Sequence, residues 1–142
     1  MQWLRTLGVA YVVLTDAPTD YSSTGEAALL RRGVAGLRPV YTTAHIRVLA
    51  VEHPRGIVTG ASDARVLRLD PAALTIEVQH AGQYRIAMRY SPYWRSSSGC
   101  VTRTPDGMTK LLVPHGGVVR LTMQVTASGS LHSLLGSSAD CG

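Results

Sequence analysis

The fold is indicated most clearly by one stretch of the chain, Tyr84-Arg-Ile-Ala-Met-Arg-Tyr-Ser-Pro-Tyr-Trp-Arg95. Larger apolar side chains recur at every second position from Tyr84 to Tyr90 and alternate with arginine or alanine. This period of two predicts a β-strand with one buried face. Pro92 ends the strand, because proline has no N–H to donate to a sheet.

Comparable patterns recur through the C-terminal two thirds of the chain. The expected strands are Ala64–Leu69, Leu74–His80, Tyr84–Tyr90, Met108–Val113 and Val118–Thr126. Turn signals lie between them: Ala81-Gly82 as a tight hairpin joint, Asp106-Gly107, and Pro114-His-Gly-Gly117. Short strands at this spacing predict an antiparallel β-sandwich of jelly-roll-like kind.

The first third of the chain mixes helix and strand signals. Its expected elements are a short helix from Trp3 that ends at Gly8, a strand Val9–Leu14 covered on both faces, a helix Glu26–Arg32 opened by the capping box Ser23-Thr-Gly-Glu26 and stopped by Gly33, and strands Leu37–Thr43 and Ile46–Glu52. This order predicts a small α/β unit.

The fold class is therefore α+β, in one compact domain overall. We expect a small α/β subdomain over residues 1–54, a β-sandwich over 55–127 and a Ser/Gly-rich tail over 128–142. A hydrophobic content of 45% with 16% charged residues is typical of a folded chain and excludes a disordered one. The longest apolar runs are too short to span a bilayer.

The net charge of +5 comes almost wholly from arginine, since Lys110 is the only lysine. Arg31-Arg32 is the only adjacent basic pair, and no basic run interleaves with aromatic residues, so we expect no nucleic-acid partner. The mild excess of positive charge fits an anionic membrane surface or a phosphorylated lipid head group as well as it fits a nucleic acid.

Two cysteines, Cys100 and Cys141, lie far apart and form no metal-binding motif. One interpretation is a disulfide that pins the tail to the sandwich, which would place the domain outside the cytoplasm. The alternative is two unrelated thiols.

The best binding candidate is the aromatic segment Tyr90, Tyr93, Trp94 and Arg95. Aromatic rings stack on sugars, and the planar arginine side chain donates to hydroxyl or phosphate groups. The competing interpretation is structural: Trp94 plugs one end of the sandwich, and Arg95 covers it with its aliphatic stem.

A second candidate is the carboxylate pair Asp16 and Asp20, in the loop after the first strand. Paired carboxylates there could bind a cation or transfer protons. Asp20 could instead belong to the helix-entry loop with Ser22 and Ser23. No spacing among the histidines predicts a metal site, and no cofactor or catalytic motif occurs, so no catalytic residue, metal or cofactor is expected.

Several motifs in order resemble a family of bacterial polytopic membrane proteins, the GT-C-type glycosyltransferases and their YfhO-like relatives. The motifs are Trp3-Leu-Arg-Thr-Leu-Gly-Val-Ala-Tyr-Val-Val-Leu14, Val40-Tyr41, Ile46–Pro54, Tyr90-Ser-Pro-Tyr-Trp-Arg95, Asp106-Gly107 and Val113-Pro-His-Gly116. The resemblance covers most of Trp3–Val125. The chain departs from it where the family's Tyr-Pro-Gly-Trp becomes Pro-Tyr-Trp and where Ser96–Cys100 is inserted.

The resemblance implies an extracytoplasmic C-terminal domain of an integral membrane protein. Its partner would be the membrane-embedded remainder of the same polypeptide, with a carbohydrate or lipid-linked sugar as a further ligand. The family's catalytic carboxylates lie in loops between membrane helices, so the resemblance implies a non-catalytic accessory domain. The alternative is a structural or protein–protein interaction module without a small-molecule ligand.

Overall fold

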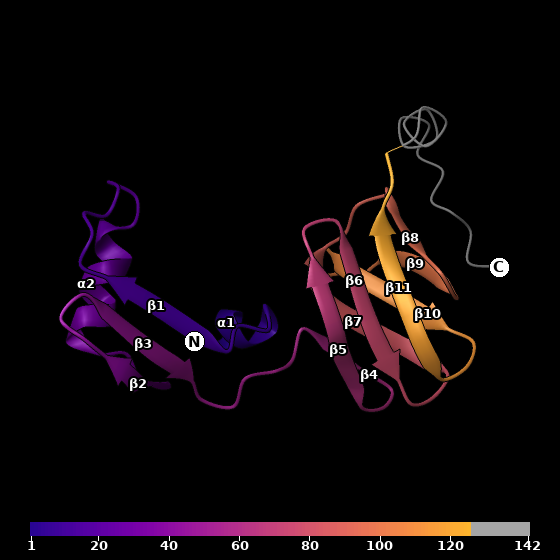
Figure 1. Cartoon of the computed structure of the whole chain (residues 1–142), viewed down its shortest axis with the longest axis horizontal. Coiled ribbons are helices and arrows are strands. Elements are labelled where there is room, and N and C mark those ends of the chain that lie inside the picture. The colour runs from indigo at the N-terminus through magenta and orange to yellow at the C-terminus, as the bar shows by residue number, and fades with distance from the viewer. Residues whose placement is uncertain (126–142) are drawn as a thin grey trace. The chain divides into compact units, whose positions relative to one another are not determined.

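The computed structural model describes residues 1–125, so the predicted tail and Cys141 lie outside the described residues. The chain divides into two compact units, Met1–Gly56 and a second that begins at Ile57 (Figure 1). Both are built on antiparallel β-sheets, and the helices are few and short. Across the described part of the chain, no helix has the length and apolar character needed to cross a membrane.

The N-terminal unit is a three-stranded sheet with two helices. Its elements are α1 (Gln2–Thr6), β1 (Tyr11–Thr15), α2 (Thr24–Arg32), β2 (Leu37–Thr42) and β3 (Ile46–Val51). These confirm the helices and strands predicted for this region. The strand order is β1-β3-β2, and β3 is antiparallel to both neighbours. The strands β1 and β2, joined through α2, therefore run parallel with β3 inserted between them.

The start of α2 differs from the predicted capping box. Ser23 is the N-cap residue, but its side chain makes no capping hydrogen bond. The Asp20 carboxylate instead accepts from the backbone N–H of Ser23 at 2.7 Å. The end of α2 is as predicted, because Gly33 takes a φ of 90°, a conformation that costs glycine little.

The sheet of this unit is covered on one face only. Leu49 and Val51 on β3 are buried, and Leu49 faces residues of α2. On the opposite face, Tyr11 and Val13 of β1 are 63% and 60% exposed. The prediction that the first strand is covered on both faces is wrong. Successive side chains alternate between the faces of a strand, and a continuous apolar run does not reveal whether a second layer exists.

The second unit contains eight strands in two sheets. They are β4 (Val58–Gly60), β5 (Ala64–Asp70), β6 (Ala73–Val78), β7 (Gly82–Arg89), β8 (Trp94–Ser96), β9 (Cys100–Arg103), β10 (Met108–Val113) and β11 (Gly117–Met123). The sheet orders are β4-β7-β10-β9 and β5-β6-β11-β8, with antiparallel neighbours throughout.

One core lies between these two sheets. Tyr84 and Ile86 on β7 are fully buried, and Met88 packs against the same cluster, which confirms the predicted alternation. The remaining core residues come from both sheets: Val58, Leu74, Ile76, Val78, Trp94, Leu111, Val113, Val119 and Leu121. The Tyr84 hydroxyl is satisfied within this core, because it donates to the carbonyl of His80 at 2.7 Å and lies 2.7 Å from Ser62 Oγ.

The connection at Ala81-Gly82 is not the predicted hairpin. The strands it joins, β6 and β7, belong to different sheets, so the chain crosses the sandwich there. The link from β10 to β11 crosses in the same way, and β6–β11 and β7–β10 are paired neighbours. The true hairpins are β5–β6 and β9–β10, and the second turns at Asp106-Gly107 as predicted.

Candidate functional site

The aromatic segment holds its tryptophan inside the sandwich. After Ser91-Pro92 the chain turns, with the Trp94 N–H donating to the Ser91 carbonyl, and β8 then pairs with the end of β11. Trp94 is only 6% exposed and belongs to the core cluster. A sugar could not stack on this ring without displacing the residues that bury it.

The neighbours of Trp94 are also committed to local contacts. Nη1 of Arg95 donates to the carbonyls of Pro92 at 2.6 Å and Trp94 at 2.9 Å. The Tyr90 N–H donates to Gly107, and the Tyr93 carbonyl accepts from Gln124. Tyr90 and Tyr93 are half-buried. Of the four predicted residues, only Trp94 is buried in the sandwich, whereas Tyr90 and Tyr93 are half-buried and Arg95 is exposed with its guanidinium held by two backbone carbonyls.

The Trp94 indole N–H is buried without a hydrogen-bond partner among the described residues. An unsatisfied buried donor costs about 1–3 kcal/mol, so this atom lowers the stability of the core. The ring still stabilises the fold, because removing an indole from a core costs more than that penalty.

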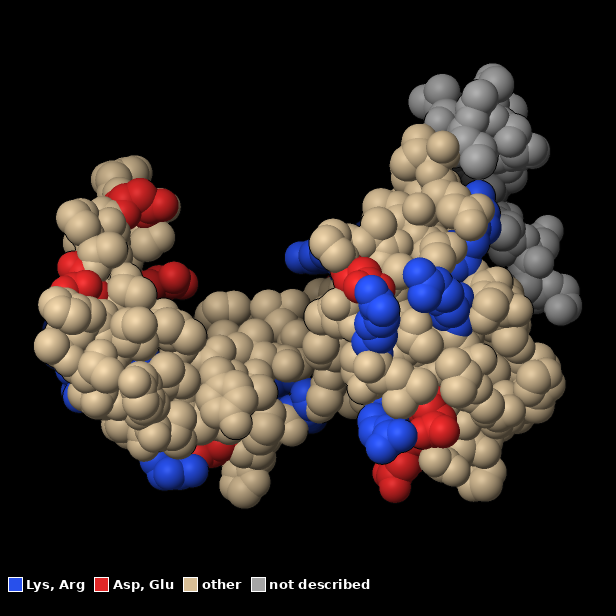
Figure 2. All heavy atoms as spheres, in the orientation of Figure 1, with Lys and Arg blue, Asp and Glu red and all other residues tan. Residues whose placement is uncertain are grey.

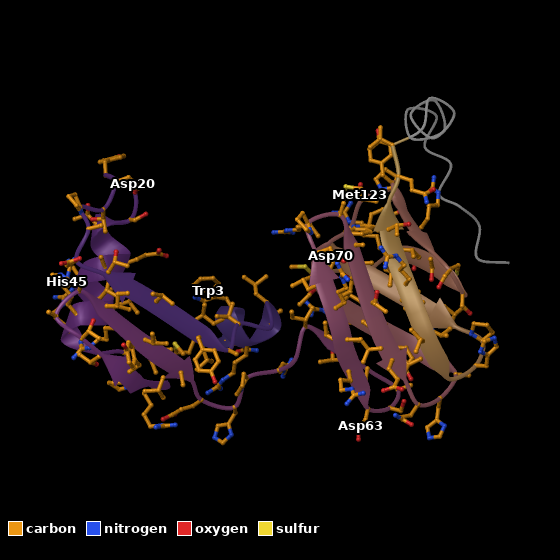
Figure 3. The ribbon with its side chains drawn as sticks, in the orientation of Figure 1. Trp3, Asp20, His45, Asp63, Asp70 and Met123 are labelled. Carbon is orange, nitrogen blue, oxygen red and sulfur yellow. The ribbon has the colours of Figure 1, made fainter. Side chains whose placement is uncertain are left out.

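The two predicted carboxylates have separate partners. Asp20 accepts hydrogen bonds from Ser23 and Ser22. These bonds lower the pKa of the Asp20 carboxyl below its usual value. Asp16 lies at the end of β1 and contacts Nδ1 of His45 at 2.5 Å. Figure 3 places Asp20 in the loop before α2 and His45 at the end of the sheet. In the described residues, no three metal-binding side chains converge.

His45 was not among the sequence-predicted site residues. It lies in the turn between β2 and β3, and the register places that turn beside the end of β1. Both partners are exposed, which makes the Asp16–His45 pair a surface contact of small energy.

A small pocket lies between α2 and the covered face of the N-terminal sheet. Its volume is about 160 Å³. Apolar residues and three arginines line it: Leu30, Arg31, Arg32, Gly33, Val34, Leu37, Pro39, Arg47 and Leu49. None of the three arginines takes part in an ion pair with another described residue. The adjacent pair Arg31-Arg32 was visible in the sequence, but its position beside Arg47 depends on the fold.

Charge is distributed differently over the visible faces of the two units (Figure 2). In the N-terminal unit, several acidic side chains lie near the loop before α2. On the visible face of the sandwich, basic side chains are scattered and several have acidic neighbours. Two such pairs are Arg65 with Glu77 and Arg68 with Asp70.

The open face of the N-terminal sheet is an apolar surface that the sequence did not reveal. Tyr11 and Val13 of β1, Ile46 of β3 and Tyr41 of β2 are all exposed, and pairing register brings them onto neighbouring strands. Contiguous exposed apolar residues mark interaction surfaces more often than scattered ones do. We call this surface, formed by Tyr11, Val13, Tyr41 and Ile46, the open face.

Cys100 begins β9 and is half-buried. Its predicted partner Cys141 lies outside the described residues, so the disulfide stays a prediction. Comparison with protein-family models, with curated proteins and with solved structures finds no match to this chain.

Proposed function

We propose that this chain is a non-catalytic interaction module that contacts another protein through its N-terminal unit. The observation that carries the proposal is the open face, where Tyr11, Val13 and Tyr41 are each more than half exposed on one layer of sheet. Tyrosine is enriched at protein interfaces, because its ring supplies apolar area and its hydroxyl remains hydrogen-bonded.

The sandwich supports this proposal as a scaffold. Trp94, the strongest sequence candidate for sugar stacking, is part of the core, and Arg95 is held by backbone carbonyls. These structural contacts explain the segment that was expected to bind a carbohydrate without requiring a ligand. A jelly-roll-like architecture stays a proposal for this unit. Its support is the presence of eight strands in two sheets of four, and the strand order is not used as an argument.

The partner and location that we propose come from the family resemblance. The motifs from Trp3 to Gly116 resemble those of extracytoplasmic domains of GT-C-type and YfhO-like membrane proteins. The module would then act outside the cytoplasm, beside the membrane-embedded part of its own polypeptide, as an accessory to a glycosyltransferase-like protein.

Photo-crosslinking in cells tests the proposed contact. A benzophenone side chain replaces Tyr41 on the open face or, as the matched control, Val118 on the sandwich, which is exposed to a similar degree (57% and 58%). We expect a crosslink to a membrane protein, or within a longer polypeptide, from position 41 only. Equal crosslinking from both positions, or none from either, would contradict the proposal.

The pocket beneath α2 favours a second candidate function, binding of a lipid-linked sugar phosphate. Arg31, Arg32 and Arg47 supply positive charge beside an apolar floor that includes Leu49, which matches a phosphate attached to a short apolar chain. Calorimetric titration with a short polyprenyl phosphate tests it. Saturable heat that is lost in Arg47→Ala supports this function, whereas equal heats for both proteins would refute it.

A further inference from the structure

The outer edge of β1 presents unpaired backbone groups. The Ala10 carbonyl accepts from Val51, and the Asp16 N–H donates to His45, both on the β3 side. Because backbone groups alternate along a strand, the N–H and C=O groups of Tyr11, Val13 and Thr15 point away from β3. Since β1 pairs with no other strand among the described residues, this edge is available for pairing (Figure 1).

The opposite edge of the same sheet is protected. β2 contains Pro39, which has no N–H, and the register with β3 shifts between Pro39 and Tyr41. Prolines and bulges are devices that prevent one sheet edge from pairing with another. β1 has neither of these devices, and the residues from Leu7 to Thr15 carry no charge.

The edges of the sandwich are also poor pairing sites in the described structure. β4 and β8 have three residues each, and β9 has four, ending at Arg103. β5 is longer, but its register shifts between Val66 and Arg68, and charged residues recur along it. The contrast singles out β1 as the one edge strand in the described chain without such protection.

We propose that β1 pairs with β1 of a second copy of this chain, antiparallel and centred on Val13. The three outward-pointing residues are spaced symmetrically about Val13, so a two-fold axis there opposes Val13 to Val13 and Tyr11 to Thr15. Each opposed pair exchanges two backbone hydrogen bonds. This register also opposes no like charges, because it places Asp16 opposite the uncharged Ala10 of the other copy.

The paired assembly joins the two N-terminal sheets into one continuous sheet. A two-fold axis perpendicular to the sheet keeps the open faces of both copies on the same side. Val13 then contacts its equivalent, and Tyr11 packs beside Thr15 of the other copy. This inference goes beyond the proposed function, since it concerns the edge of the sheet rather than its face and needs no other protein.

Sedimentation equilibrium of the full 142-residue chain, with reductant present, tests the proposal. We expect a concentration-dependent mass that rises from 15.2 kDa toward twice that value. Val13→Lys should raise the dimer dissociation constant at least tenfold, because the register opposes two like charges. Val118→Lys is the matched control, since Val118 is 58% exposed and lies on a central strand; it should leave the constant unchanged.

A second variant, Val13→Pro, removes an N–H that β3 does not use, so it should abolish dimerisation while circular dichroism remains that of a folded chain. A wild-type chain that stays monomeric up to about 1 mM, the limit of weak association, would overturn the proposal. Equal effects of Val13→Lys and Val118→Lys would overturn it too. Neither result bears on a crosslink from Tyr41, so the two proposals fail separately.

Discussion

In the sandwich, two sheets enclose a core in which Tyr84, Ile86 and Leu111 have no exposed surface, whereas the N-terminal unit leaves Tyr11 and Val13 more than half exposed. The few residues buried in the N-terminal unit are Leu4, Ala27, Leu49 and Val51. In the N-terminal unit, α2 lies against one face of the three-stranded sheet, and the other face stays open although it is also apolar. We therefore expect the sandwich to contribute most of the stability, and our proposal gives the contact surfaces to the N-terminal unit.

The largest expected effect comes from the tryptophan in the sandwich. Trp94→Ala should lower the free energy of unfolding by about 3–5 kcal/mol, the usual cost of removing a large aromatic ring from a core. Trp3→Ala is the control in the N-terminal unit: Trp3 is 58% exposed, so the change should stay within about 0.5 kcal/mol. Urea unfolding followed by far-UV circular dichroism measures both. Similar losses would remove the contrast between the two units.

The second-largest effect is expected from replacing one glycine in each unit with alanine. Gly99 has a φ of 74°, and a Cβ there would lie 1.9 Å from the Leu112 carbonyl oxygen. Gly33 has a φ of 90° but no heavy atom within 4 Å of such a Cβ. Both alanine variants meet backbone strain of roughly 1–3 kcal/mol, and Gly99→Ala also meets the clash. Urea midpoints should therefore fall further for Gly99→Ala. A larger fall for Gly33→Ala would show that β9 is not packed closely against β10.

A smaller effect is expected at the tyrosine hydroxyl in the core. Tyr84→Phe removes the hydrogen bond to the His80 carbonyl and the contact with Ser62, which should cost about 0.5–1.5 kcal/mol. Tyr41→Phe, at an exposed tyrosine of the open face, should change stability very little. Equal stability of Tyr84→Phe and wild type would mean that water replaces the lost partner, which full burial of the ring argues against.

The smallest effect concerns pH. The bond from Arg85, with a second from Thr104, lowers the pKa of Asp106 from 3.8 to about 2. Because the folded pKa is the lower one, this carboxylate stabilises the fold above 3.8, and its contribution disappears as the pH falls from 3.8 toward 2.

Asp106→Asn should thus lose less stability than wild type over that acid range. Asp63→Asn serves as the control, because the Asp63 side chain accepts no hydrogen bond within the described structure. The measurement is the thermal unfolding midpoint of each protein at several pH values across this acid range. Parallel midpoint curves for Asp106→Asn and wild type would contradict the role of the Arg85–Asp106 pair.

Much of the fold was predictable because local patterns decided it. The alternation from Tyr84 to Met88 located the central strand, and Gly33 located the end of α2. The short strands β4, β8 and β9 were missed, since three or four residues carry no measurable period. Ala81-Gly82 was wrongly predicted as a hairpin because a turn signal does not say which sheet receives the next strand.

The site was predicted less well than the fold. The sequence singled out the aromatic segment at Trp94, but it left the burial of this tryptophan as one of two interpretations. The arginine pocket and the Asp16–His45 contact arise from elements far apart in sequence, so only the fold brings their residues together. The open face was missed because the continuous apolar run of β1 is typical of a strand covered on both faces, whereas here Tyr11 and Val13 on the second face are exposed.

Amide hydrogen exchange along β1, followed by NMR at several protein concentrations, tests most directly the claim that the N-terminal unit carries an unprotected pairing edge. We predict that Val12 and Leu14, whose N–H groups face β3, exchange slowly at every concentration. The N–H groups of Tyr11, Val13 and Thr15 should exchange rapidly in dilute protein and slow down as concentration rises. Slow exchange of these three N–H groups at every concentration would show that the chain already covers this edge. Rapid exchange at every concentration would show that nothing pairs with it. Either result would contradict the account.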